Sequence, residues 1–237
     1  MKSRPFAFVL YARVPRRGEV KTRMIPPLDA DEALALHVAL VEDSLDLLRD
    51  AAAAAAAVPY VAFSEPSSGA TGGPDRRLSR AVGDIDLLPQ RGRDLGERLR
   101  HTCDDLLQRL HPGVVVIGSD SPTLPPKRLV QARAALRQDA DAVIGPTEDG
   151  GYYLIGVARS LPGLFENIAW GTGSVYADTL AAARRIGART DVLPFWYDID
   201  RPDDLGRLYR EAHRKQGGAA RTMAIAAALA REGRLDG

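Results

Sequence analysis

The sequence predicts an α/β protein with a mostly parallel β-sheet and helices on both faces. Two observations support this class. Strand-like and helix-like segments alternate through most of the chain, and the strongest strand-like runs are apolar at every position. A continuous apolar run is typical of a strand that is covered on both faces. Ligands of such sheets bind beyond the carboxyl ends of the strands, so the loops that follow the strands are the expected functional segments.

The expected strands are short and bounded by turn residues. The two clearest read FAFVLYA and VVVIG, at 6–12 and 114–118. The full set of expected strands covers 6–12, 58–63, 85–88, 114–118, 142–145, 152–157 and 192–199.

Helical segments fall between these strands. The longest runs from 31 to about 57 and repeats apolar residues at three- and four-residue spacing, which marks an amphipathic helix. The segment 64–74 is rich in Gly, Ser and Pro and is expected to be a flexible surface loop. The expected helices cover 31–57, 94–110, 125–138, 173–186, 202–215 and 221–232.

Length and composition fit a globular chain. It has 237 residues, of which 45% are hydrophobic and 27% charged, close to the globular average. We expect one domain at 1–216 and a C-terminal helical tail at 217–237. The net charge of +1 argues against a general affinity for nucleic acid or acidic membranes. The single cysteine, Cys103, excludes an internal disulfide and a cysteine-built zinc site.

Targeting signals are not apparent. The chain has no run of 18 apolar residues that would predict a membrane span, and its first residues lack the apolar core of a signal peptide. These observations predict a cytoplasmic protein with no membrane span. The sequence does not specify the oligomeric state.

The loop after the first expected strand is strongly basic. Residues 13–23 read RVPRRGEVKTR, with five basic residues and one acid. A positive loop at the end of a buried strand suits a polyphosphate, which it can bind by charge and by backbone N–H groups. The loop is neither a P-loop nor a dinucleotide fingerprint. A solvated basic loop is the alternative, but the position after the first strand favours phosphate binding.

The strand at 114–118 is followed by an acid, Asp120, at the ligand edge of the sheet. Magnesium usually takes one or two protein carboxylates, together with phosphate oxygens and water. The alternative is a cap for the next helix, but that helix begins several residues later and Thr123 is the better cap. The pattern therefore favours Asp120 as a metal ligand.

The loop GPTEDGGYY at 145–153 places Asp149 before two glycines. Paired glycines allow positive φ and a close approach of the backbone to a ligand. Asp-Gly is also an ordinary choice for a tight hairpin turn, and both interpretations can hold together.

The segment YDIDRPDD at 197–204 carries two alternating acids, Asp198 and Asp200. Side chains that alternate along a strand point to opposite faces, so at most one of the two is expected to share a metal with Asp120. Capping of the helix that begins near Pro202 is an equally good role for Asp200.

The segment QRGRDLGER at 90–98 could read a nucleobase edge or an acceptor. Taken alone, it fits a capped helix start better, with Asp94 as the cap and Glu97 three residues later. The four histidines are scattered and form no metal-ligand pair in sequence, so a histidine-based metal site or acid–base catalyst is not expected.

The motifs taken together resemble one bacterial family of unknown function in the nucleotide-diphospho-sugar transferase superfamily. They come in the same order as in that family, and the resemblance runs from about Phe6 to Leu208. The family is similar to 2-phospho-lactate guanylyltransferase and molybdenum cofactor guanylyltransferase. Its members are often labelled glycosyltransferases, some in connection with arsenosugar synthesis. The matching motifs are VKTRM at 20–24, GSDSP at 118–122, GPTEDGGYY at 145–153, WGT at 170–172 and DIDRPDDL at 198–205.

The resemblance implies a GT-A fold, a single Rossmann-like domain with a mixed sheet. It also implies that Lys21 and Arg23 grip the phosphates and that Asp120 and Asp200 bind Mg²⁺ or Mn²⁺. Asp149, from its own loop, is a candidate for orienting the acceptor, and we place it with Lys21, Arg23 and Asp120 in the expected catalytic set. The expected nucleotide-binding set is Tyr11, Ala12, Arg13, Gly18, Lys21, Arg23, Gln90, Gly96 and Ser119.

The chain departs from the family at two minor positions. It has Tyr11-Ala12-Arg13 where relatives often read Phe-Ala-Lys, and Arg201 where they have threonine or a similar residue. At the first departure Arg13 stands where relatives have lysine, so the positive charge is kept but the side chain differs.

We therefore expect a magnesium-dependent nucleotidyltransferase. It would move a nucleoside monophosphate from a nucleoside triphosphate to a small phosphorylated or acidic acceptor and release pyrophosphate. A glycosyltransferase that uses a nucleotide-sugar is the alternative, but these enzymes usually show D-x-D where this chain has Ser119-Asp120-Ser121. A nucleotide-binding partner protein without catalysis is the third hypothesis. The sequence names neither the base nor the acceptor.

Overall fold

A seven-stranded sheet forms the centre of the computed structural model, which describes residues 4–64, 76–212 and 218–235. The strand order is β3-β2-β1-β4-β6-β5-β7. Only β6 among these strands pairs antiparallel to its neighbours, so the predicted mixed, mostly parallel sheet is confirmed. The strands are β1 (Ala7–Arg13), β2 (Val58–Ser64), β3 (Asp86–Pro89), β4 (Val114–Gly118), β5 (Ala142–Pro146), β6 (Tyr152–Val157) and β7 (Thr190–Val192).

Local sequence signals explain where several helices begin. Asp29 caps α1 by accepting the N–H groups of Asp31 and Glu32, and the Glu32 carboxylate accepts the Asp29 N–H in return. The predicted cap of α3 is confirmed, because Asp94 accepts the N–H of Glu97 at 2.8 Å. The helices are α1 (Ala30–Ala55), α2 (Arg76–Val82), α3 (Leu95–Gln108), α4 (Lys127–Gln138), α5 (Val175–Arg185), α6 (Pro202–Ala212) and α7 (Ala220–Arg231).

Alternation along the strands builds a core on each face of the sheet. Phe8 and Leu10 of β1 pack with α1, α2 and α4, whereas Val9 and Tyr11 pack with α3 and α5. Both faces are therefore covered, as the continuous apolar runs predict. None of the described helices is apolar over a length that would let it cross a membrane.

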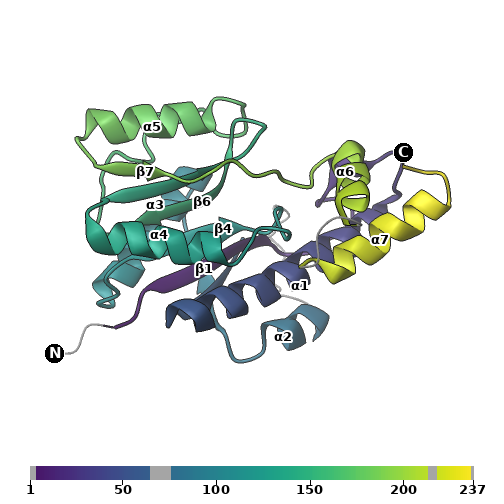
Figure 1. Ribbon diagram of the computed structural model, residues 1–237, viewed down its shortest axis with the longest axis horizontal. Coiled ribbons are helices and arrows are strands. Elements are labelled where there is room, and N and C mark those ends of the chain that lie inside the picture. Colours follow the sequence, from purple (N-terminus) through teal and green to yellow (C-terminus); the bar gives the residue numbers. More distant parts are fainter. Residues whose placement is uncertain (1–3, 65–75, 213–217, 236–237) are drawn as a thin grey trace.

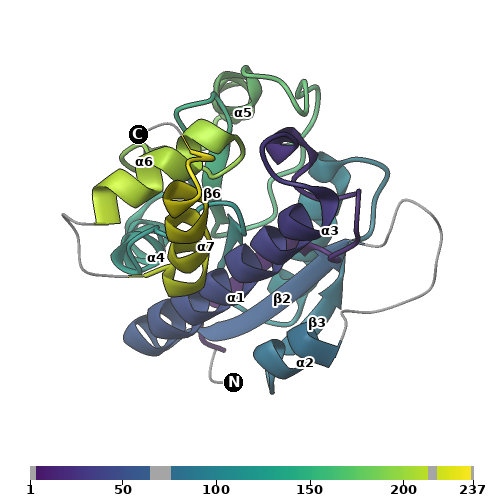
Figure 2. The same cartoon turned by 90° about the vertical axis from the view of Figure 1, so that its right-hand side faces the viewer.

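A third core cluster lies away from the sheet. In Figure 1, α6 and α7 gather beyond one end of the strands, and Figure 2 shows α7 beside α1. Leu36 and Leu40 of α1 pack there with Leu205 of α6 and Leu229 of α7. The C-terminal helices thus close over the edge of the sheet where the strands β1 and β4 end.

Two expectations about elements were wrong or incomplete. The strand expected at 192–199 is limited to β7, Thr190–Val192. Beyond it the N–H groups of Leu193 and Trp196 still donate to β5, but Pro194 between them has no N–H, and the pairing there is only an isolated bridge at Trp196. The short helix α2 was not predicted from the sequence. The loop expected at 64–74 lies, apart from Ser64, outside the described residues, as do residues 213–215 of the expected helix 202–215.

Candidate functional site

A cavity of about 560 Å³ opens at the carboxyl ends of β1 and β4, the position that the sheet topology predicts. The basic loop after β1 forms one wall and the start of α3 another. Its lining contains most of the predicted site residues, namely Tyr11, Ala12, Arg13, Lys21, Arg23, Gln90, Ser119, Asp120 and Asp200. We call it the phosphate cavity, after the basic loop in its wall, which is predicted to bind phosphate.

The centre of the phosphate cavity is a charged triad. The Lys21 ammonium lies 2.6 Å from Oδ1 of Asp120, 2.7 Å from Oδ1 of Asp200 and 2.7 Å from the carbonyl oxygen of Ile199. The Lys21 side chain is only 6% exposed. Burial disfavours the ammonium, but the two carboxylates outweigh this effect and raise the pKa of Lys21. The same ammonium overcomes the burial of Asp120 and lowers the pKa of that carboxyl.

The backbone brings these three residues together from distant parts of the chain. Lys21 has a φ of 48°, in the left-handed region, and turns the basic loop into a short 3-10 helix at Thr22–Met24. The N–H of Ile199 donates to the carbonyl oxygen of Asp120 at 2.8 Å, which fixes the segment before α6 against the end of β4. This bond places Asp200 opposite Asp120.

The alternative capping roles are not observed for either aspartate. The α4 cap position, Pro126, makes no side-chain cap, and Asp120 is turned to Lys21 instead. At α6 the N–H groups of Asp200 and Arg201 donate to the carboxylate of Asp204, at 2.9 and 2.7 Å. Asp200 is therefore free of the capping role and faces the phosphate cavity.

Asp198 forms a third carboxyl beside this pair. Its side chain accepts a hydrogen bond from the hydroxyl of Ser121. Burial, and then the negative charges of Asp120 and Asp200, raise the pKa of Asp198 to about 7. Asp198 and Asp200 have different hydrogen-bond partners, Ser121 and Lys21, but they do not lie on a strand, so the expected alternation of faces is not tested.

A second cavity of about 540 Å³ adjoins the phosphate cavity. Arg23, Leu95 and Asp200 line both, so the two cavities meet at these residues. Arg23 is 62% exposed and lies 4.0 Å from Oδ2 of Asp200. The second cavity also contains Asp149, Tyr152, Trp170, Asp198 and Arg201.

Two side chains that were predicted to bind a nucleotide, Tyr11 and Gln90, are held by hydrogen bonds within the protein. The hydroxyl of Tyr11 is committed to α3, where it bonds to Thr102 at 2.6 Å and to the carbonyl oxygen of Arg98 at 2.9 Å. Gln90 donates its amide N–H groups to the carbonyl oxygens of Ala62 and Ala12, at 2.7 and 3.3 Å. These side chains hold the rim of the cavity in place, and the Gln90 carbonyl accepts no hydrogen bond from any residue that the structure describes.

Gly18 and Gly96 lie outside the described lining of the phosphate cavity. A Cβ on Gly96 would come within 2.7 Å of the carbonyl oxygen of Phe165 and 2.9 Å of the Trp170 ring, so this glycine permits close packing of α3. Gly18 has a φ of +77° with open space around it, as a turn in the basic loop requires. The structure gives each glycine a conformational reason, and contact with a nucleotide stays a prediction.

The Asp149 loop forms the tight turn that is one of its two expected interpretations, and the approach to a ligand stays a prediction. Oδ1 of Asp149 accepts the Thr147 hydroxyl at 2.5 Å and the Gly151 N–H at 3.1 Å, which closes a tight turn. Gly150 has a φ of +89°, and a Cβ there would lie 1.9 Å from the carbonyl oxygen of Gly173. The turn also lines the second cavity, so its position agrees with an acceptor-side role.

His37 is a site residue that sequence reasoning missed. It lies on α1, lines the phosphate cavity, and its Nε2 is 3.0 Å from the carbonyl oxygen of Arg13. Burial lowers the pKa of His37, so the ring is held neutral behind the basic loop. Nothing in the helical pattern around His37 marks it, because only the fold brings the loop across α1.

The charged centre has the chemistry that a divalent cation requires. Oxygens of Asp120 and Asp200 converge on one point, which the Lys21 ammonium fills. Within the described ranges no group of three or more histidine, cysteine or acidic side chains could hold a metal ion. Magnesium commonly binds one or two carboxylates, so the pair fits a magnesium site completed by phosphate oxygens and water.

Solved structures share this fold. A candidate nucleotide-diphospho-sugar transferase from Desulfovibrio desulfuricans G20 is 30% identical, covers 95% of both chains and superposes with a TM-score of 0.83. CMP:2-keto-3-deoxy-manno-octonic acid synthetase in complex with CTP is 11% identical, with a TM-score of 0.55, over 88% of this chain and 98% of that one.

A synthase with bound UDP has the same architecture. Glucosyl-3-phosphoglycerate synthase from Mycobacterium tuberculosis, in complex with Mg²⁺ and UDP, is 14% identical over 98% of this chain and 81% of that one, with a TM-score of 0.51. Because these two proteins are only 14% and 11% identical to the chain, the similarity establishes the fold alone. No curated protein matches the chain in sequence.

A family model matches residues 47–172, more than half of the chain, and this region includes α3, β4 with Asp120, and the Asp149 loop. The fold is that of the nucleotide-diphospho-sugar transferases, and the Desulfovibrio desulfuricans protein extends the similarity over nearly all of the chain. The chain therefore belongs to the bacterial family described as "Uncharacterized protein conserved in bacteria (DUF2064)".

Proposed function

We propose that the protein is a divalent-metal-dependent nucleotidyltransferase. It would transfer a nucleoside monophosphate from a nucleoside triphosphate to a small phosphorylated or acidic acceptor. An acceptor oxygen would form a bond to the α-phosphorus as the bond to the bridging oxygen of the β-phosphate breaks, and pyrophosphate would leave. This reaction depends mainly on positioning and on electrostatic stabilisation.

One observation carries the proposal: the two cavities meet at the charged centre. A donor in the phosphate cavity and an acceptor in the second cavity would approach each other beside Asp200 and Arg23, which line both. The neighbouring CMP:2-keto-3-deoxy-manno-octonic acid synthetase carries CTP on the same fold, which supports a nucleotide as the donor.

The residues of the centre have separable roles in this proposal. Asp120 and Asp200 would hold Mg²⁺ or Mn²⁺, which when bound supplies charge neutralisation of the phosphate oxygens. Lys21, released from the carboxylates, and Arg23 would neutralise the triphosphate and the leaving pyrophosphate. Arg201 and Arg23 make the second cavity suitable for an anionic acceptor, and Asp149 would orient it.

A glycosyltransferase that uses a nucleotide-sugar is the second candidate. It is favoured by the shared fold with glucosyl-3-phosphoglycerate synthase, whose complex contains Mg²⁺ and UDP. The basic loop argues for the nucleotidyltransferase, because a triphosphate carries more negative charge than the diphosphate of a nucleotide-sugar.

A thermal-shift panel separates the two. The protein with Mg²⁺ is compared with each of the four nucleoside triphosphates and with UDP- and GDP-sugars. A ligand at about 100 times its Kd stabilises by about 2.7 kcal/mol, which corresponds to a rise in Tm of about 5–10 °C for a chain of this size.

Stabilisation by one triphosphate, lost in Asp120→Asn and kept in the exposed control Asp191→Asn, supports nucleotidyl transfer and names the base. Stabilisation by nucleotide-sugars alone refutes it in favour of glycosyl transfer. A protein that binds a nucleotide but forms no product with any acceptor tested is a binding protein without catalysis.

A further inference from the structure

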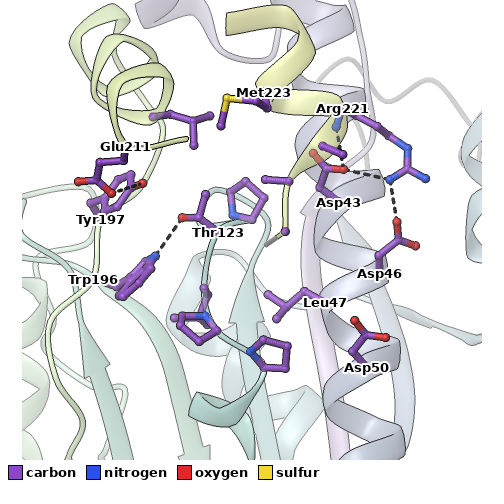
Figure 3. A pocket seen from close by; sticks show the side chains of 18 residues that line it. Asp43, Asp46, Leu47, Asp50, Thr123, Trp196, Tyr197, Glu211, Arg221 and Met223 are labelled. Atoms are coloured by element: carbon purple, nitrogen blue, oxygen red, sulfur yellow. Dashed lines mark hydrogen bonds and ion pairs between the residues drawn. The ribbon is translucent and has the colours of Figure 1, made fainter. Parts of the chain in front are cut away.

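A third cavity, of about 560 Å³, lies between α1, α6, α7 and the loop after β4. Figure 3 shows this cavity with Trp196 on one side and Asp50 on the other. None of its described lining residues belongs to the phosphate cavity. Its size falls within the usual range of small-molecule sites, about 300–1,000 Å³, so it is large enough for a ligand of its own.

Most of its wall is apolar. Pro122, Pro125 and Pro126 of the loop after β4 line it. So do Leu47 of α1, Trp196 of the segment before α6 and Met223 of α7. The indole N–H of Trp196 donates to the hydroxyl of Thr123 at 3.1 Å, which fixes the orientation of the ring. A rigid apolar wall of this kind favours an apolar ligand body.

The polar groups of the wall are mainly acidic. Asp43 and Asp46 share the guanidinium of Arg221, at 3.0 and 2.7 Å. Glu211 accepts a hydrogen bond from the Tyr197 hydroxyl at 3.3 Å and pairs with Arg207 at 3.1 Å. These three carboxylates are therefore already compensated by groups of the protein.

Asp50 differs from the other three. It is exposed on the same face of α1, and within the described part of the chain it forms no hydrogen bond or ion pair. The cavity thus combines a fixed apolar wall, one indole face and one uncompensated negative charge. A carboxylate attracts an organic cation, and an apolar wall with an aromatic ring suits the apolar body of such a ligand.

We propose that this cavity is a second ligand site, which binds a small organic cation with an apolar body, such as an arylalkyl amine. The ammonium lies against Asp50 and the apolar body against Trp196 and the three prolines. The proposal does not depend on the nucleotidyltransferase activity, because this cavity shares no lining residue with the phosphate cavity and only Tyr197 with the second cavity.

Trp196 provides a direct readout. The chain has two tryptophans, so Trp170→Phe leaves Trp196 as the single indole reporter. In this background, 4-phenylbutylamine is titrated to millimolar concentration and the Trp196 emission is recorded. The matched probes are 4-phenylbutanol, which lacks the charge, and 4-phenylbutanoate, which reverses it.

The expected result is a saturable change in emission with the amine, and a Kd for the alcohol about fivefold higher. Asp50→Asn should raise the Kd of the amine by about the same factor, because an exposed charge pair contributes modestly. The control Asp84→Asn, an exposed aspartate outside the cavity, should leave the Kd unchanged. Added salt should weaken binding of the amine but not of the alcohol.

Equal binding of amine and alcohol, or an unchanged Kd in Asp50→Asn, would overturn the proposal. So would the absence of any saturable signal.

Discussion

Replacing Lys21 by methionine removes the cation at the centre of the phosphate cavity. Methionine keeps much of the aliphatic stem but leaves the carboxylates of Asp120 and Asp200 facing each other without the ammonium that lies 2.6 and 2.7 Å from them. We expect the variant to fold with lower stability, and we expect Mg²⁺ to restore more stability in the variant than in the wild type.

The structure sets the size of the effect. Removing one partner of a buried ion pair typically costs about 3–5 kcal/mol, because it leaves an uncompensated charge. The carboxylates remain 41% and 33% exposed, so water screens them and the lower limit applies. A loss of about 3 kcal/mol lowers the Tm of a chain this size by about 6–12 °C.

The assay is thermal unfolding of both proteins in EDTA and in a series of Mg²⁺ concentrations. In the wild type the cation must displace the ammonium, whereas in Lys21→Met the two carboxylates are free, so the variant should respond at lower Mg²⁺. The exposed Lys127→Met serves as the matched control and should behave as the wild type. An equal Mg²⁺ response in Lys21→Met and wild type would refute the reasoning that Lys21 occupies the cation position.

The remaining predictions concern turnover, the Asp149 turn and the cysteine. Asp120→Asn should lower the turnover of nucleotidyl transfer by about 100-fold or more without loss of the fold; a fully active variant, checked by circular dichroism, would remove Asp120 from the mechanism. Gly150→Ala should lower the free energy of unfolding in chemical denaturation clearly more than Gly187→Ala. Both glycines have positive φ, but only at Gly150 would a Cβ lie against a carbonyl oxygen, at 1.9 Å. Equal losses of stability in the two variants would show that this contact relaxes freely. Burial raises the pKa of Cys103 to about 12. Alkylation of this thiol by iodoacetamide at pH 8 should therefore proceed only as fast as unfolding exposes it. Rapid labelling of the native protein would contradict this expectation.

The stability of the C-terminal region rests on contacts that no local pattern reveals. The carboxylate of Asp43, in the middle of α1, accepts the N–H of Thr222 at 2.8 Å and the Thr222 hydroxyl at 2.8 Å. It thereby satisfies the start of α7 from another helix. The sequence predicted the helix at 221–232 but not its anchor, because the two residues lie 179 positions apart.

In the candidate site, too, local features could be predicted from the sequence and long-range contacts could not. The positions of Asp120 and of the basic loop could be predicted because an apolar strand followed by polar residues marks the ligand edge of a parallel sheet. The strand expected at 192–199 could not be placed correctly, since Tyr197 and Ile199 at its end pack with α1, α6 and α7 instead of entering the sheet. That displacement is what carries Asp198 and Asp200 to Asp120.

The sequence by itself determined the α/β class, most of the strands and helices, and the loops that line the phosphate cavity, because each depends on local periodicity and on turn residues. Tertiary structure alone decided that Lys21 lies between Asp120 and Asp200, that His37 supports the basic loop, and that a third cavity forms between α1 and the C-terminal helices. The physical reason is distance along the chain. Lys21 and Asp200 are 179 positions apart, and their opposite charges come into contact only when the basic loop after β1 and the segment before α6 meet in the folded protein.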